Sequence, residues 1–193
     1  LILGAGHSLD FVAPFQMAEE TLVVDPSRHA DSRNLVESIL RYIPGFKGYL
    51  EKEYRRDSDY LARTHLGDQL RKCKTELDHY QRALVESAAL DELPKCERLR
   101  TRIDTLESRV RGAVRGYSGF FDFVRVNEEV LDDVYNHDMA LLTDVGKLLD
   151  AAGQLSTTET TNVTVDDLLQ QIEDLHSKFD GRSALLEGLD DKS

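Results

Sequence analysis

The sequence predicts an all-α protein built around a long antiparallel coiled-coil helical hairpin, with two further helices packed against it as a bundle. Apolar residues recur at alternating steps of three and four along most of the chain, which is the period of an amphipathic helix. Only four prolines interrupt the 193 residues, so long helices can form. The charged fraction is high, 31%, and the apolar fraction is 40%, which is typical of elongated helices that bury one stripe.

The first 30 residues are predicted to form an N-terminal arm that is either disordered or loosely docked. Residues 1–6 followed by Asp25 imitate the strand, glycine turn and acidic residue of a dinucleotide-binding unit. Pro14 interrupts the helix that such a unit needs, and no further strands follow, so we disfavour nucleotide binding. A short helix is expected over 31–43, because its apolar residues share one face.

The clearest signal is a pair of heptad patterns joined by a short turn. Helices are expected over about 47–87 and 92–114, with the turn near 88–91. Two apolar seams with so short a connection should pack antiparallel. The seam residues are Leu66, Leu70, Cys73, Leu77, Tyr80 and Leu84 in the first helix, and Cys96, Leu99, Ile103, Leu106, Val110 and Ala113 in the second.

Two further helices complete the predicted bundle. The first, over about 127–152, has an apolar stripe wider than a coiled-coil seam, so it should pack on two neighbours. A polar linker leads to a final amphipathic helix over about 165–188, in which residues 180–181 are a point where the helix could end or kink. The predicted organisation is an arm over 1–30, a helical hairpin bundle over 31–152, and a linker with a C-terminal amphipathic helix over 153–193.

The net charge of −12 disfavours nucleic acid as a partner, because phosphate backbones need a cationic surface. The charge is unevenly distributed along the chain. Residues 47–115 carry 16 basic and 13 acidic side chains, and residues 116–193 carry five basic and 17 acidic ones. These two parts would attract each other if they packed together.

The two cysteines, Cys73 and Cys96, fall on the seams at different distances from the turn. At about 1.5 Å of rise per residue they lie more than about 10 Å apart, which is too far for a disulfide. Reduced thiols are typical of a cytoplasmic protein. No signal peptide is recognised, and no apolar run reaches the length of a membrane span.

Asp138 is the one polar residue within the apolar stripe of its helix. A buried carboxylate must be paired or neutralised. The simplest partner is an arginine from the hairpin, namely Arg56, Arg63 or Arg111. One interpretation is a buried ion pair that fixes the helix register, and the other is a position that contacts a small ligand.

The open end of the hairpin, away from its turn, combines charged and aromatic residues. Residues 53–60 mix both signs of charge around two tyrosines, and a glycine- and aromatic-rich corner follows at 116–123. Ordinary ion pairs on solvated helix faces are the simpler interpretation of the charges. The candidate binding residues at this end are Tyr54, Arg55, Arg56, Tyr117, Phe120 and Asp138.

The sequence indicates no enzyme, no metal and no cofactor. Asp133 and His137 share a helix face, but a metal-carboxylate bundle needs a second such pair, which is missing from the sequence. No nucleophile stands in a glycine elbow, and no phosphate-binding loop precedes a helix.

Residues 45–57 (GFKGYLEKEYRRD), with residues 116–122 (GYSGFFD), resemble an uncharacterised family of bacterial helical proteins. The resemblance covers about 44–150 and leaves out 1–30 and 155–193. It implies a protein that accompanies stomatin-like membrane-scaffold proteins, with no assigned activity or catalytic residue.

The function expected is therefore a non-enzymatic protein–protein interaction or scaffold module, with a protein partner or a second copy of itself. One alternative is a peripheral membrane-associated factor whose segment 35–50 lies on a bilayer, although excess negative charge opposes anionic lipid. The other is a helical bundle that binds a small ligand with Asp138 and a hairpin arginine.

Overall fold

A computed structural model describes residues 26–113, 128–155 and 162–187. Over these residues the chain is helical and contains no strand, which confirms the predicted all-α fold class. The elements are α1 (Pro26–Tyr42), α2 (Lys52–Glu86), the short 3-10 helix η1 (Leu90–Glu92), α3 (Leu93–Gly112), α5 (Glu128–Leu155) and α6 (Val165–Glu187).

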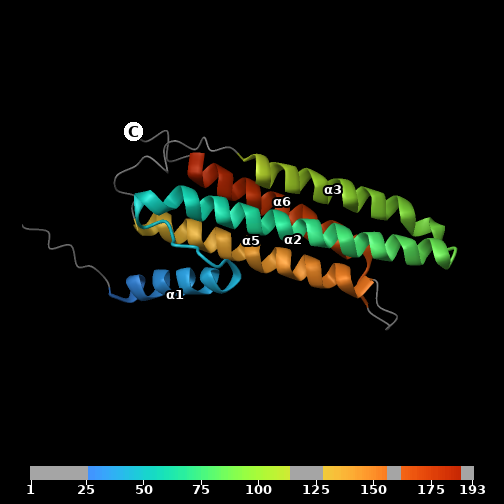
Figure 1. Cartoon of the computed structure of the whole chain (residues 1–193), viewed down its shortest axis with the longest axis horizontal. Coiled ribbons are helices and arrows are strands. Elements are labelled where there is room, and N and C mark those ends of the chain that lie inside the picture. The colour runs from blue at the N-terminus through green and yellow to red at the C-terminus, as the bar shows by residue number, and fades with distance from the viewer. Residues whose placement is uncertain (1–25, 114–127, 156–161, 188–193) are drawn as a thin grey trace, which may run out of the picture.

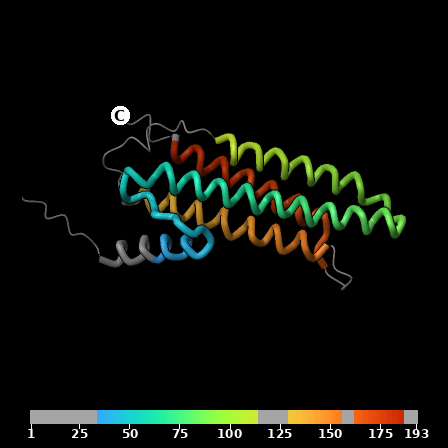
Figure 2. Tube along the Cα trace, in the orientation of Figure 1, coloured from blue at the N-terminus to red at the C-terminus, as the bar shows by residue number. Residues whose placement is uncertain are grey.

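The four long helices form two hairpins that lie side by side (Figure 1). In one hairpin α2 packs against α3, and in the other α5 packs against α6. The hairpins join through contacts of α2 with α5 and of α3 with α6, and α1 packs on α5. The trace in Figure 2 shows that α2 and α5 run in the same direction, as do α3 and α6.

The antiparallel register of α2 and α3 follows from their seams and from polar pairs across them. The predicted seam residues are buried, apart from the half-buried Tyr80 and Ala113. Lys74 Nζ lies 2.7 Å from Asp104, and Gln81 donates to Glu97 across 2.7 Å. Gln81 lies seven residues after Lys74 in α2, and its partner Glu97 lies seven residues before Asp104 in α3. The two pairs therefore fix the predicted antiparallel register.

Three ion pairs at heptad spacing join α3 to α6, and we call them the charge ladder. Lys95 pairs with Asp166 at 2.8 Å, and Arg102 with Glu173 at 3.8 Å. The third pair is Arg109 with Asp180. Basic side chains of α3 thus face acidic side chains of α6, in line with the attraction expected between the basic and acidic parts of the chain.

The turn of the hairpin lies where the heptads predict it. Ser87 caps α2, and Ala88 adopts the left-handed conformation with φ +58°. The amide of Ala88 donates to Val85 O and that of Ala89 to Leu84 O, which is the Schellman pattern of helix termination. The chain then enters η1 and α3 directly.

Two helix starts differ from the prediction. α2 begins at Lys52 rather than near 47, because Gly45 and Gly48 adopt φ of +88° and +83° and keep the preceding segment out of the helix. α1 begins at Pro26, a residue suited to the first helical position, rather than at 31. The rest of the predicted arm, residues 1–25, lies outside the described residues.

The last helix confirms the predicted range of about 165–188, and residues 180–181 do not end it. α6 continues to Glu187, because Arg182 and Leu186 extend its buried face beyond Gly181. Burial of these two side chains compensates for the low helix propensity of glycine.

The two cysteines are buried and free, as their seam positions predict. Burial raises the pKa of the Cys73 thiol to about 12 and that of Cys96 to about 11. Both thiols are therefore protonated at neutral pH and are poor nucleophiles.

Candidate functional site

A buried polar cluster lies at the open end of the hairpin, where α2, α5, α6 and the segment before α2 meet. It consists of Tyr49, Asp59, Arg63, Asp138 and Arg182, and we call these five residues the ionic cluster. Each is buried, with Arg63 the most exposed at 9%. Charged residues this deeply buried are rare unless they are paired.

The members form one continuous chain of hydrogen bonds. The Tyr49 hydroxyl donates to Asp138 Oδ2 at 2.5 Å, and Arg182 Nε donates to Asp138 Oδ1 at 2.5 Å. Arg182 Nη2 also donates to Asp59 Oδ1 at 2.9 Å. Asp59 Oδ2 in turn accepts from Arg63 Nε at 2.8 Å. Two carboxylates and two guanidinium groups therefore alternate and balance in charge.

The segment before α2 is held in place around Tyr49. The backbone amide of Tyr49 donates to Tyr135 Oη at 2.6 Å, and the rings of Tyr49 and Tyr135 stack with their centroids 5.3 Å apart. Arg55 Nε donates to the Tyr49 carbonyl at 2.7 Å. A Cβ at Gly48 would lie 2.8 Å from Tyr135 Oη, so the close approach of the backbone to Tyr135 requires glycine.

The electrostatics favour a protonated tyrosine between fixed charges. Burial, reinforced by the Asp138 carboxylate, raises the pKa of Tyr49 well above its ordinary value. Burial alone would lower the pKa of Arg182, but the charge of Asp138 and the neighbouring acidic groups outweigh burial and raise it. Tyr49 is thus a hydrogen-bond donor, and Arg182 remains a cation.

Every buried side-chain polar atom of the ionic cluster has a hydrogen-bond partner within the protein, so none is left to bind a ligand. Among the described residues, Gln171 Oε1 is the buried side-chain polar atom that lacks a hydrogen-bond partner, and it lies outside the cluster. Both oxygens of Asp138 are engaged within the protein. The arrangement therefore supports the interpretation of Asp138 as part of a buried ion pair that fixes helix register.

The prediction that Asp138 pairs with an arginine of the hairpin was wrong. The arginine that binds Asp138 is Arg182 from α6, not an arginine of the hairpin. Arg63 joins the cluster only through Asp59, and Arg111 pairs instead with Asp68 and Glu107. A signal existed, because Arg182 interrupts the apolar stripe of α6 as Asp138 interrupts that of α5.

The other candidate residues are not brought together. Arg55 is buried beside the cluster, whereas Arg56 is exposed. Tyr54 is half-buried, and the Lys47 ammonium group lies 4.2 Å from its ring centre. Tyr117 and Phe120 lie outside the described residues, together with the whole 116–123 corner. Sequence patterns did not reveal three members of the cluster: Tyr49 precedes a helix, Asp59 sits among exposed charges, and Arg182 follows Gly181.

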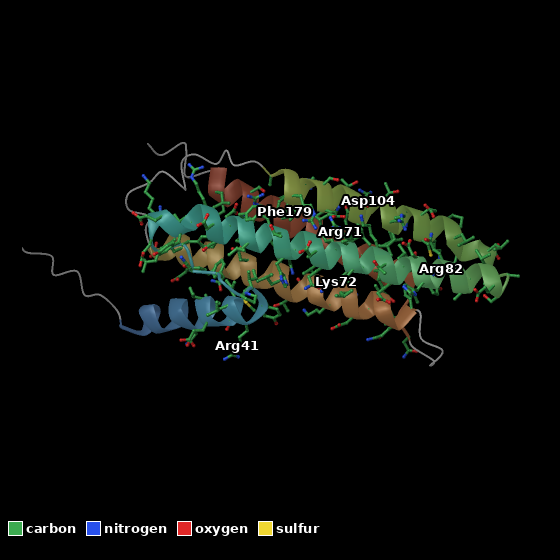
Figure 3. All side chains as sticks on the ribbon, viewed as in Figure 1. Arg41, Arg71, Lys72, Arg82, Asp104 and Phe179 are labelled. Atoms are coloured by element: carbon green, nitrogen blue, oxygen red, sulfur yellow. The ribbon has the colours of Figure 1, made fainter. Side chains whose placement is uncertain are left out.

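A second candidate lies at the opposite end of the molecule. The turn end of the α2–α3 hairpin projects beyond α5 and α6 (Figure 1). We use the name hairpin end for residues 78–97, which include this turn. Val85 is 58% exposed there and Leu90 is 53% exposed. An open groove of about 570 Å³ lies on this end, with Arg82 on its α2 side (Figure 3). Its lining residues are Asp78, Gln81, Arg82, Val85, Glu86, Leu93 and Glu97.

The described side chains offer no group of three metal-ligating residues, and this includes the region of Asp133 and His137. None of the helices in the described part of the chain is long and apolar enough to cross a membrane. Comparisons with protein-family models, curated proteins and solved structures found no match to this chain. The function is therefore argued from the geometry of the molecule.

Proposed function

We propose that this chain is a non-enzymatic protein-interaction module that presents its hairpin end to a protein partner. The observation that carries the proposal is the exposure of Val85 and Leu90 on a projecting end of the bundle. A single exposed aliphatic residue is common on any protein. Val85 lines a groove and Leu90 lies at the adjoining turn, and exposed apolar residues placed in this way on a projecting end are typical of an interaction surface.

The rest of the bundle supports this role by making the hairpin rigid. The charge ladder holds α3 on α6, and the ionic cluster ties α2 to α5 and α6 at the far end. A rigid hairpin end loses little conformational entropy when it binds, which favours affinity. The resemblance to bacterial proteins that accompany stomatin-like scaffolds fits such a role.

The test is retention of proteins from the native organism on immobilised chain variants. The Val85→Ser/Leu90→Ser variant removes the exposed apolar side chains of the hairpin end. The Leu50→Ser/Tyr60→Ser variant is the matched control, because those side chains are 70% and 57% exposed elsewhere. We expect the wild type and the control to retain the same proteins and the hairpin-end variant to lose them. Equal retention by all three would contradict the proposal.

A second candidate, peripheral membrane attachment through segment 35–50, is favoured by one observation. Leu40, Tyr42 and Leu50 in this segment are 45%, 45% and 70% exposed. Side chains of this kind insert into the interfacial region of a bilayer. Flotation with vesicles of neutral lipid tests this candidate. If segment 35–50 attaches the protein to a membrane, the wild type and the Val85→Ser/Leu90→Ser variant float with the vesicles, and the Leu40→Asp/Leu50→Asp variant does not.

A further inference from the structure

We infer that the groove of the hairpin end binds a basic amphipathic helix of a protein partner. The inference rests on the proposed function and adds the chemistry of the partner. It follows from three properties of residues 78–97: their apolar side chains, their uncompensated carboxylates and the shape of the space between α2 and α3.

Apolar side chains from both sides of the turn contribute to the surface of the hairpin end. Val85 and the half-buried Leu93 both line the groove, and Leu90 is exposed at the turn between them in sequence. Polar bridges at the inner end of the groove, from Asp78 to Arg100 and from Gln81 to Glu97, keep the two helices in register. The groove is therefore formed before a partner arrives.

The charges around the groove favour a cationic partner. Residues 78–97 contain five carboxylates and two basic side chains, although the hairpin as a whole, residues 47–115, carries three more basic than acidic groups. Lys95 is engaged by Glu92 and Asp166, and Asp78 by Arg100. The remaining carboxylates of the hairpin end, Glu86, Asp91 and Glu97, form no ion pair with a described residue.

A helix is the shape that the groove accepts best. Two antiparallel helices leave a furrow into which the side-chain ridge of a third helix packs. A partner helix that places leucine-like residues at i, i+3 or i+4, and i+7 would cover Val85 and Leu93. Lysine or arginine on its flanks would then face Glu86 and Glu97. Nucleic acid and acidic peptides are disfavoured, because their charge has the same sign as that of the surface.

The test uses two synthetic peptides of about 16 residues with leucine at this spacing. One carries lysine at the flanking positions and the other carries glutamate there. Fluorescence anisotropy with the full chain should show that the lysine peptide binds at least about tenfold more tightly than the glutamate peptide. The difference should shrink at high salt, because exposed charges are screened.

Chain variants show whether the peptide uses the groove. Val85→Ser/Leu90→Ser should weaken binding of the lysine peptide by about tenfold, and Glu86→Gln/Glu97→Gln should weaken it by about threefold or more. Leu50→Ser/Tyr60→Ser should leave it unchanged. All of these side chains are exposed or at the groove surface, and circular dichroism melting verifies that each variant is folded. If a hairpin-end variant does not fold, Val85→Ala replaces it.

Two results would overturn the inference: equal binding of both peptides, or equal binding by the wild type and the hairpin-end variants. The retention experiment separates this failure from failure of the proposed function. If cellular proteins are lost with Val85→Ser/Leu90→Ser but the lysine peptide does not bind, the hairpin end is an interaction surface whose partner is not a basic helix. If neither occurs, both proposals fail.

Discussion

Arg182 Nε of α6 lies 2.5 Å from Asp138 Oδ1 of α5, although the two residues are 44 positions apart in the sequence. The same guanidinium reaches Asp59 of α2 at 2.9 Å. One side chain near the end of α6 therefore joins α6 to both α5 and α2. Because a misplaced α6 would leave the buried Asp138 without a cation and Asp59 with Arg63 alone, this contact selects one arrangement of the bundle.

Replacing Arg182 should be among the most destabilising single substitutions in the chain. Arg182→Leu leaves Asp138 buried without its cation and leaves Asp59 with Arg63 alone, and breaking a buried pair from one side costs about 3–5 kcal/mol. The double variant Asp138→Leu/Arg182→Leu should cost less than the sum of the two single variants, because it removes both charges. Urea unfolding followed by circular dichroism measures these free energies.

The control for Arg182 is Arg102→Leu. Arg102 lies 3.8 Å from Glu173, and both side chains are more than half exposed. An exposed pair of this kind contributes at most about 1 kcal/mol. A cost for Arg182→Leu no larger than that for Arg102→Leu would show that the ionic cluster does not stabilise the fold in the way described.

The charge ladder should contribute less to stability and should depend on salt. Asp166→Asn/Glu173→Gln/Asp180→Asn removes the acidic side of all three pairs, and we expect a loss below about 3 kcal/mol in total, since exposed pairs contribute about 0–1 kcal/mol each. In about 1 M NaCl the loss should become smaller, because the Debye length falls to about 3 Å. Thermal and urea unfolding at low and high salt measure both effects.

The matched control removes three carboxylates that form no ion pair with a described residue, in the variant Glu86→Gln/Asp91→Asn/Glu97→Gln. Its stability should differ little from that of the wild type at either salt concentration. If both triple variants lose the same stability with the same salt dependence, the ladder acts only through net charge.

Much of the fold was predictable because heptads report which face of a helix is buried. Each of the two apolar seams, Leu66 to Leu84 and Cys96 to Val110, needs a second apolar surface to cover it. The short turn between them allows only an antiparallel pairing. A heptad does not say which other helix covers a face, so the parallel neighbours α2 with α5 and α3 with α6 were beyond the pattern. The uneven charge of the chain indicated that its basic and acidic parts attract each other. The charge ladder, in which basic residues of α3 pair with acidic residues of α6, is one place where they meet.

The ionic cluster was only half predictable. Asp138 was identifiable because a carboxylate interrupts a long apolar stripe. Arg182 was missed because it follows Gly181, which weakens a helix locally, and the buried face of α6 overrides that local preference. Tyr49 lies in no helix, so periodicity says nothing of it, although it is fully buried. Such tertiary contacts depend on the assembled bundle rather than on any one segment.

The stability of the hairpin should fall in acid through Glu107. Burial alone would raise the pKa of Glu107, but hydrogen bonds from Lys74 and Arg111 outweigh it and hold the pKa below its ordinary value of 4.5. The folded state then binds the proton less tightly than the unfolded state. The stabilisation is therefore complete above about pH 4.5 and is lost as the pH falls through the folded-state pKa.

Glu107→Gln should be less stable than the wild type by about 1.5–3 kcal/mol near neutral pH, the usual contribution of hydrogen bonds to a charged group. The difference should narrow as the pH falls through the folded-state pKa of Glu107, because the wild-type carboxyl then becomes protonated. Urea unfolding across this pH range measures it, with Glu86→Gln as the exposed control. A difference that stays constant with pH would rule out titration of Glu107 as the cause.

Two glycines should respond oppositely to replacement by alanine. Gly48→Ala should be destabilising, because φ is +83° and the new Cβ would lie 2.8 Å from Tyr135 Oη; the backbone term alone costs about 1–2 kcal/mol. Gly146 is inside α5 and a Cβ there would meet no described atom within 4 Å, so Gly146→Ala should gain about 0.5–1 kcal/mol. Urea unfolding of both variants tests this, and a change of the same sign at both positions would contradict the assigned conformations.

Replacing Ala88 in the turn of the hairpin should increase the stability of the protein. Ala88 occupies the left-handed position of a Schellman motif with φ +58°, where glycine is normally found because it has no Cβ to strain the backbone. Ala88→Gly should therefore raise the free energy of unfolding by about 0.5–1 kcal/mol, the relief of strain being partly offset by the greater freedom of glycine in the unfolded chain. Ala89→Gly is the control, because Ala89 has φ −85° and should only lose stability. If both substitutions destabilise the protein equally, residue 88 is not held in the left-handed conformation.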